Sequence, residues 1–189
     1  AGTIRWDGTR WLMPTVYSRR GLDLGGELRH LGTRSQSLLS GNLLPNDSSQ
    51  GHTRSRLRFT GVTSFGDNWR LSLDGENVSD AQYFEDFSQG SDGASIAFLP
   101  RVAHLSYRDD HLKLGALARN FQTIDQALLP LDRPYTEAPR LYADGTWTRG
   151  DKARLEYGFQ SEVTGFRRNA GVDGWRMDLA PQVALRYEQ

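Results

Sequence analysis

The sequence predicts an all-β fold: an antiparallel transmembrane β-barrel segment of about ten strands, with short periplasmic turns and long extracellular loops. Three observations predict it. Side chains alternate with a period of two, the connections alternate between short and long, and aromatic residues recur near the expected strand ends. No apolar run approaches the roughly 18 residues of a membrane-spanning helix, so that class is excluded.

Composition leaves two kinds of β protein open. The chain has 189 residues, of which 37% are apolar and 11% aromatic, and its mean hydropathy is -0.61. This length is enough for one domain with a buried core. A soluble sandwich fits these values, and so does a membrane barrel, because a barrel strand turns only every second side chain toward lipid.

The charge balance and the lack of cysteine argue against two classes of function or site. The 23 basic and 23 acidic residues give a formal net charge of zero without long blocks of one sign, which disfavours nucleic-acid binding through a basic face. No cysteine is present, so the chain itself forms no disulfide or thiolate metal site. It starts at Ala1 without a signal peptide, and we expect either a processed protein or a piece of a longer one.

The clearest strands flank Gly66-Asp67-Asn68. Leu57 and Phe59 share one face of the first strand, opposite Arg56 and Arg58, and the alternation resumes after the turn. A hairpin is therefore expected here, followed by a long aromatic and acidic loop.

The remaining elements follow the same pattern. Residues 1–11 form an unassigned N-terminal segment with a hairpin signal at Asp7-Gly8, and residues 12–189 form the barrel domain. Pro14 cannot donate to a ladder, which suggests an edge, a strand start or a bulge. The expected strands are residues 12–18, 22–31, 36–44, 56–65, 69–78, 95–108, 111–121, 140–148, 153–166 and 175–187.

Connection lengths favour the membrane barrel. Short turns near residues 32, 67, 109 and 151 alternate with loops near residues 48, 86, 130 and 170 that are expected to be about twice as long or more. Outer-membrane barrels have this asymmetry. Seven aromatic residues near strand ends fit a girdle at the lipid interface, although aromatics capping a soluble core remain an alternative. They are Trp69, Tyr107, Phe121, Trp147, Phe166, Trp175 and Tyr187.

Several motifs point to one family. They are residues 18–24 with 27–31, residues 43–47, residues 78–87, Phe121-Gln122, and Pro134-Tyr135 with Pro139. In order and spacing they resemble the LptD family of outer-membrane proteins, which assemble lipopolysaccharide on the cell surface. The resemblance covers residues 12–187 and only the early-to-middle part of the family's barrel. Family members are several times longer, with a periplasmic jellyroll joined by disulfides to a barrel of 26 strands.

The resemblance implies a role for the parent protein in the Gram-negative cell outer membrane. Lipopolysaccharide would arrive along the periplasmic Lpt bridge, meet the jellyroll and leave between the first and last barrel strands. An LptE-type lipoprotein would plug the lumen. This chain would contribute barrel wall and external loops in contact with membrane lipid, without a cofactor, a metal or nucleic acid.

Two groups of residues are candidate sites. Tyr83, Phe84, Asp86 and Phe87 match the family's external-loop motif. One interpretation is a loop that folds inward over the lumen. We favour a self-packed loop, because an aromatic cluster orders a long loop without touching substrate.

The second group is basic. Its members are Arg19, Arg20, Arg56 and Arg58, whose guanidinium groups suit lipopolysaccharide phosphates. Solvated charges of the lumen or rim are the commoner explanation.

Two other barrel functions are alternatives. A rim hydrolase would need convergent catalytic groups, and Asp109-Asp110-His111 is the place where such residues adjoin. They form a tight turn in which neighbouring side chains diverge, so we predict no enzyme activity. A passive porin fits the alternation, but the motif series argues against it.

Overall fold

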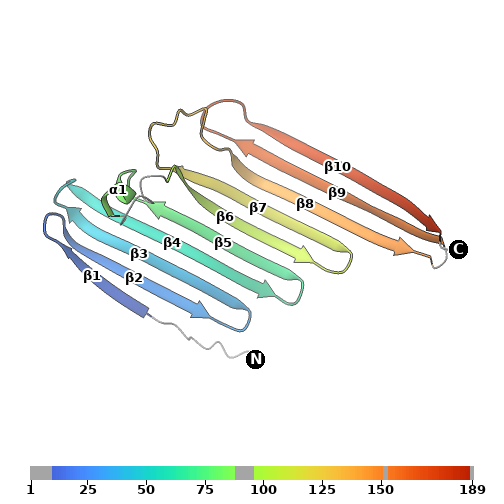
Figure 1. The fold of residues 1–189 in the computed structure, drawn as a ribbon, viewed down its shortest axis with the longest axis horizontal. Coiled ribbons are helices and arrows are strands. Elements are labelled where there is room, and N and C mark those ends of the chain that lie inside the picture. The colour runs from blue at the N-terminus through green and yellow to red at the C-terminus, as the bar shows by residue number, and fades with distance from the viewer. Residues whose placement is uncertain (1–9, 88–95, 151–152, 188–189) are drawn as a thin grey trace. The chain divides into compact units, whose positions relative to one another are not determined.

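The computed structural model describes residues 10–87, 96–150 and 153–187. These residues form ten strands in one sheet, in the order β1 to β10, with a single short helix (Figure 1). The predicted all-β antiparallel fold is confirmed. Within the described residues β1 and β10 each have one neighbour in this order. Most of the segment 1–11, with its Asp7-Gly8 hairpin, lies outside the described residues.

The elements occur in a simple meander. In order they are β1 (Arg10–Tyr17), β2 (Gly21–Leu31), β3 (Ser35–Asp47), β4 (His52–Phe65), β5 (Trp69–Val78), α1 (Tyr83–Phe87), β6 (Phe98–Arg108), β7 (Leu112–Thr123), β8 (Thr136–Arg149), β9 (Ala153–Arg167) and β10 (Gly174–Tyr187). We call the strand ends joined by residues 18–20, 48–51, 79–97, 124–135 and 168–173 the long-loop end, and the opposite ends the short-turn end.

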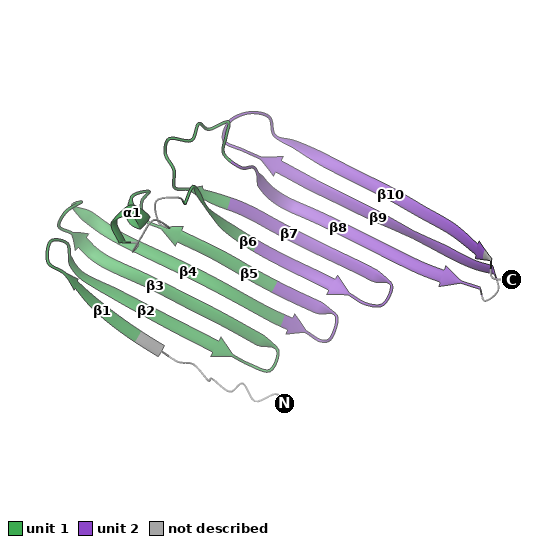
Figure 2. Cartoon of the chain, viewed as in Figure 1, with its two compact units in different colours: residues 1–63, 72–102, 121–133 green, residues 64–71, 103–120, 134–189 purple. Residues whose placement is uncertain are grey.

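Two compact units share the chain (Figure 2). Unit 1 comprises residues 1–63, 72–102 and 121–133, and unit 2 comprises residues 64–71, 103–120 and 134–189. Each unit has its own sheet faces.

In unit 1 the two sheet faces differ in chemistry. Pairing places Leu24 opposite Leu43, and Gly41 opposite Leu57, on one face. Leu24 and Leu57 are 48% and 54% exposed. Charged and amide side chains, such as Asn42, occupy the other face. We call these the apolar face and the polar face of unit 1.

Unit 2 repeats this division. Val163 pairs with Leu141 on one side and with Met177 on the other, and Met177 is 76% exposed. The adjacent positions Glu162 and Asp178 pair on the opposite face. Unit 2 therefore also has an apolar and a polar face.

Charged side chains are buried and large apolar side chains are exposed, which is the reverse of the usual arrangement in a soluble protein. The charged Asp47 and Arg54 are both 0% exposed, whereas Leu12 and Leu179 are 87% and 66% exposed. Soluble monomers rarely leave contiguous apolar surface of this kind in water.

The loop predicted near residue 48 is wrong in length. The β3–β4 connection is Ser48–Gly51, only four residues, and Pro45 lies inside β3 instead of ending it. The pairing of β3 with β4 shifts between Leu44 and Asp47, and such a bulge accommodates a proline that donates no ladder hydrogen bond. The connections 79–97, 124–135 and 168–173 are long, as predicted.

Other differences concern boundaries. The expected loop after β5 contains helix α1, which the sequence analysis did not predict. Strand β8 begins at Thr136 and not at Arg140, because a register shift between Glu137 and Arg140 lets pairing with β9 resume beyond Pro139. Pro14 was expected at an edge, a strand start or a bulge, and it lies in β1, which is an edge of this strand order.

Aromatic residues flank the apolar face of unit 2. Trp69 lies 5.1 Å from Tyr107, and Trp147 lies 5.9 Å from Tyr157, both toward the short-turn end. Trp175 is 66% exposed toward the long-loop end. Phe166, predicted for the same girdle, is an exception. It lies on the polar face, with its ring 5.9 Å from Tyr135 and under Arg176.

Among the described residues no helix is long and apolar enough to cross a membrane.

A substitution at Gly158 tests how closely the backbones of β8 and β9 approach each other. A Cβ at Gly158 would collide with the backbone carbonyl oxygen of Gly145, whereas at Gly75 it would meet only Arg101 at 3.8 Å. We expect Gly158→Ala to lower the free energy of unfolding by about 1–3 kcal/mol, because the backbone must move, and Gly75→Ala to change it little. Thermal unfolding of the purified protein measures both. Equal stability of the two variants would contradict the close approach of β8 and β9 at this position.

Candidate functional site

Five charged residues converge at the long-loop end of unit 1. Arg20 lies in the β1–β2 turn, Asp47 ends β3, and Arg54 lies near the start of β4. Asp80 and Asp86 belong to the connection after β5, where Asp86 is part of α1. We call these five residues the rim cluster. It joins three successive strand connections.

Arg54 is the centre of the rim cluster. Its side chain is fully buried, and it makes a bidentate contact with Asp80, with Nε and Nη2 donating at 2.9 and 2.7 Å. Its Nη1 donates to Asp86 and lies 3.5 Å from Asp47, whose side chain is also fully buried. A buried guanidinium is tolerated only when carboxylates surround it in this way.

Arg20 closes the cluster from the β1–β2 turn. Its Nη1 donates to Asp47 at 2.9 Å, and its Nη2 donates to Asp86 at 2.7 Å. Asp47 also accepts a hydrogen bond from the backbone N–H of Ser49 at 2.9 Å. Two cations thus share three anions, and backbone groups help to satisfy the surplus negative charge.

The aromatic residues of α1 cover the cluster. The Arg54 guanidinium lies 4.8 Å from the Phe87 ring centroid and 5.6 Å from that of Tyr83. Arg20 lies 5.3 Å from Phe87, and Arg56 lies 5.4 Å from Phe84. Since Arg56 projects from the polar face of β4, α1 packs over that face.

An apolar cluster also fixes α1. Tyr83 and Phe84 are 6% and 4% exposed, and they pack with Val78, Leu99 and Ile124. The loop is therefore anchored both by ion pairs and by a small apolar core. The four residues predicted as a loop motif, Tyr83, Phe84, Asp86 and Phe87, lie together in this anchor.

The environment shifts the proton affinities of the loop. Burial raises the pKa of Asp86, but hydrogen bonds from Arg54 and Arg20 outweigh it, and the pKa lies below its ordinary value of 3.8. Asp80 behaves alike, because Arg54 and Ser79 outweigh the effect of burial on its pKa. Burial raises the pKa of Tyr83 to about 12. The loop carries ionised carboxylates and a neutral phenol at neutral pH.

The four arginines predicted as phosphate contacts have different surroundings. Arg20 belongs to the rim cluster, and Arg56 and Arg58 donate to Glu76 at 2.5 and 2.9 Å. Arg19 is exposed in the β1–β2 turn, and within the described residues no carboxylate pairs with it. The structure brings Arg56 and Arg58 together through Glu76, and it places Arg19 apart from them.

Sequence reasoning missed the centre of the site. Arg54, Asp47 and Asp80 were not candidates, although Asp47 and Asp80 fall inside the motifs quoted above. One signal was available: Arg54 has the same parity as Arg56 and Arg58 and so shares their polar face. Its carboxylate partners are distant in sequence, and no local pattern identifies them.

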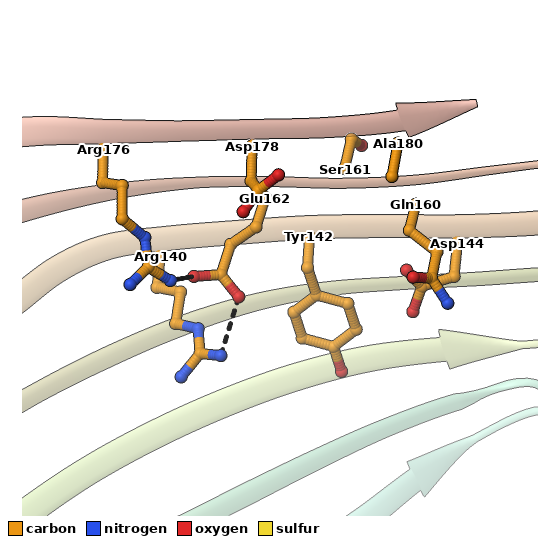
Figure 3. A pocket seen from close by; sticks show the side chains of 9 residues that line it. All are labelled: Arg140, Tyr142, Asp144, Gln160, Ser161, Glu162, Arg176, Asp178 and Ala180. Atoms are coloured by element: carbon orange, nitrogen blue, oxygen red, sulfur yellow. Dashed lines mark hydrogen bonds and ion pairs between the residues drawn. The ribbon is translucent and has the colours of Figure 1, made fainter.

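A second polar site lies on unit 2. A pocket of about 400 Å³ opens on the polar face of β8, β9 and β10 (Figure 3). Glu162 lies at one end and accepts hydrogen bonds from Arg140 at 2.7 Å and Arg176 at 2.8 Å. Tyr142 projects into the same space, and the lining also includes Asp144, Gln160, Ser161, Asp178 and Ala180.

The acidic turn considered for hydrolysis has a structural role. Asp109 accepts hydrogen bonds from the backbone N–H of His111 and Leu112 at 2.8 and 2.7 Å, and from the Tyr107 hydroxyl at 2.7 Å. Hydrogen bonds from His111, Tyr107 and Leu112 hold the pKa of Asp109 below its usual range. In the described part of the chain no three acidic or histidine side chains are arranged to hold a metal ion.

Comparison with known proteins supplies the family. The family model described as LptD, LPS transport system D, matches residues 52–189. The chain belongs to the LptD family. The "LPS-assembly protein LptD" of Alkalilimnicola ehrlichii is 33% identical over 184 residues, which are 94% of this chain and 24% of that protein. Those of Bordetella pertussis and Nitrosococcus oceani are each 30% identical, over 92% and 93% of this chain. The chain spans about a quarter of their length, at 22% and 24%.

The residues that suggested LptD have structural roles in unit 1. The Gln122 amide donates to the Val78 carbonyl at 2.7 Å and accepts from the Val78 N–H at 3.1 Å, so one side chain satisfies the backbone at the end of β5. Arg20, Asp47 and Asp86 belong to the rim cluster. The motifs therefore hold together the long-loop end of an LptD segment.

Removing the central cation tests the rim cluster. Arg54→Gln removes the bidentate arginine partner of Asp80 and leaves the buried Asp47, with Asp86, to Arg20 alone, and we expect the free energy of unfolding to fall by about 3–5 kcal/mol. The control is Arg29→Gln, whose side chain is 62% exposed in its pair with Glu27 and which should cost about 0–1 kcal/mol. Chemical denaturation measures both variants. A cost for Arg54→Gln no larger than that of the control would show that the cluster does not stabilise the fold.

We expect low pH to weaken the ion pairs that hold residues 79–87 to the rim cluster. Since the folded pKa of Asp86 is lowered, the stabilisation is complete above 3.8 and is lost as pH falls below that value through the folded pKa. Hydrogen exchange of residues 79–87, corrected for intrinsic rates, should show constant protection from neutral pH to about pH 5 and a loss below pH 3.8. Asp86→Asn should reduce protection already at neutral pH. Wild-type protection at pH 3 equal to that at pH 5 would refute the role of this ion pair.

Proposed function

We propose that this chain is part of an outer-membrane translocon that inserts lipopolysaccharide into the outer leaflet. In this proposal residues 12–189 form a partial β-barrel domain that contributes barrel wall and extracellular loops. The observation that carries it is the inverted burial of the sheet in a chain of the LptD family: leucines cover one face and ion pairs cover the other. A barrel wall needs these two faces, one toward hydrocarbon and one toward water.

The aromatic levels of unit 2 support a membrane position. Tyr157 pairs with Trp147, and Gly165, eight positions further along β9, pairs with Trp175. Eight steps span about 26 Å along a strand, or about 20 Å of height at a tilt of about 40°. This is close to the roughly 25 Å apolar band of outer-membrane barrels, whose borders carry aromatic girdles.

The loop residues receive a role in this proposal. Tyr83, Phe84, Asp86 and Phe87 hold α1 over the polar face of unit 1, which would face the lumen of a barrel. The loop would cap the lumen wall at the extracellular side. Of the four candidate phosphate contacts Arg19, Arg20, Arg56 and Arg58, the exposed Arg19 is the best placed, because the other three are paired with carboxylates.

The partners follow from the family and belong to the whole protein. We propose lipopolysaccharide as the cargo, an LptE-type lipoprotein inside the barrel and the periplasmic Lpt bridge as the source of cargo. The polar pocket of unit 2 would be a wet part of the lumen wall. We also propose that the chain has no enzyme activity and that long loops lie at the cell surface. Neither a passive porin nor a rim hydrolase is favoured by the family match.

Depletion of the protein in its own cell tests the proposal. Lipopolysaccharide should disappear from newly made outer leaflet and accumulate on the inner side, because the exit through the membrane is lost. Surface labelling of lipopolysaccharide after a pulse of synthesis measures this, with an unrelated outer-membrane porin depleted in parallel as the control. Normal delivery of new lipopolysaccharide after depletion would rule out the function.

A further inference from the structure

Two arginines lie on the apolar face of unit 2, one at each end. Arg149 ends β8 and pairs with Leu155, and Arg167 ends β9 with the same parity as Val163 and Gly165. Both side chains are exposed. In β8, β9 and β10, the positions of this face between them carry no charged residue: Leu141, Ala143, Gly145 and Trp147, then Leu155 to Gly165, then Trp175 to Leu185, taking every second residue.

Each arginine lies just beyond an aromatic level. Arg149 follows Trp147 by two residues, so both point to the same face at the short-turn end. Arg167 lies two residues beyond Gly165, which pairs with Trp175 at the long-loop end. Tryptophan marks the border of the apolar band, and a long cationic side chain beyond it reaches the polar side.

The spacing of the two arginines matches a bilayer. Along β9, Leu155 and Arg167 are twelve positions apart, about 40 Å of strand, or about 30 Å of height at a tilt of about 40°. The hydrocarbon core of a bilayer is about 30 Å thick. The two guanidinium groups would therefore stand at the two headgroup layers.

Two neighbouring arginines, Arg168 and Arg176, interact with other groups of the protein itself. Arg168 donates from Nε to the carbonyl of Ala170 at 2.7 Å and lies 4.2 Å from the Tyr135 ring centroid. Arg176 projects from the polar face to Glu162. Within the described ranges no carboxylate forms an ion pair with Arg167 or Arg149. Their charges are available to an external anion.

We propose that Arg149 and Arg167 bind the phosphate groups of membrane lipids, one in each leaflet, and fix the depth of this wall in the bilayer. The inference rests on the proposed membrane position and adds a lipid-binding role for two named residues. A guanidinium donates two parallel hydrogen bonds to phosphate, which a lysine ammonium replaces only as a point charge.

Thermal unfolding with added lipid tests this inference on the purified full-length protein in dodecyl maltoside micelles. Dimyristoylphosphatidylglycerol should raise the Tm of the wild type, whereas dimyristoylglycerol, which lacks phosphate, and inorganic phosphate should not. The double variant Arg149→Gln and Arg167→Gln should lose at least half of this rise. The double lysine variant should keep part of it, because the charge remains.

A matched control lies on the opposite face of the sheet in unit 2, in β9 and β10. Arg154→Gln with Arg186→Gln removes two exposed polar-face arginines and should leave the lipid-dependent rise unchanged, whatever happens to the Tm without lipid. An unchanged rise in the Arg149 and Arg167 glutamine variant, an equal effect of the lipid without phosphate, or no effect of lipid on the wild type would each overturn the inference. If surface lipopolysaccharide still fails after depletion in those cases, the proposed function stands without it.

Discussion

The structure depends on the separation of charge from apolar surface across a single layer of strands. With a period of two, most charged side chains lie on one side of the strands and most leucines and valines on the other. Phe166 on the polar face, and Arg149 and Arg167 at the ends of the apolar face, are exceptions. On the polar side the charges neutralise one another across strands, as Arg56 and Arg58 do with Glu76, and Arg140 and Arg176 with Glu162. A second sheet stacked on the leucines would have made a soluble sandwich. The exposed leucines instead suit hydrocarbon.

The rim cluster holds together the strand connections at the long-loop end of unit 1. Three strand connections at the long-loop end must be held without a thick core, and a small apolar cluster around Tyr83 and Phe84 is too limited to do so alone. Arg54 supplies five donors in one plane, which is enough to bind carboxylates from separate connections, and the ring of Phe87 shields it from water. Burying this network is costly unless every partner is present. The long-loop end should therefore order as one unit, which suits a rim that must keep its shape.

Periodicity alone predicted most of the fold, because the exchange of apolar and charged positions is local. Leu57 and Phe59 could be assigned to one face, and Arg56 and Arg58 to the other, without any tertiary information. The errors arose where tertiary contacts override local signals. Pro45 suggested a strand end, but a bulge absorbs it, and α1 forms in a loop because its aromatic residues find a surface to cover. Arg54 was invisible as a site centre, since its partners Asp47, Asp80 and Asp86 come together only in the folded chain.

The central claim is that one face of these strands meets lipid while the other stays wet. Spin labels placed singly at each of residues 155–163 of β9 in the full-length protein, reconstituted in vesicles, test it most directly through collision with oxygen and with a water-soluble nickel chelate. The account predicts that odd positions, such as Tyr157 and Ser161, are accessible to oxygen, and that even positions, such as Gln160, are accessible to nickel, alternating along the strand. Equal nickel accessibility at successive positions would contradict it.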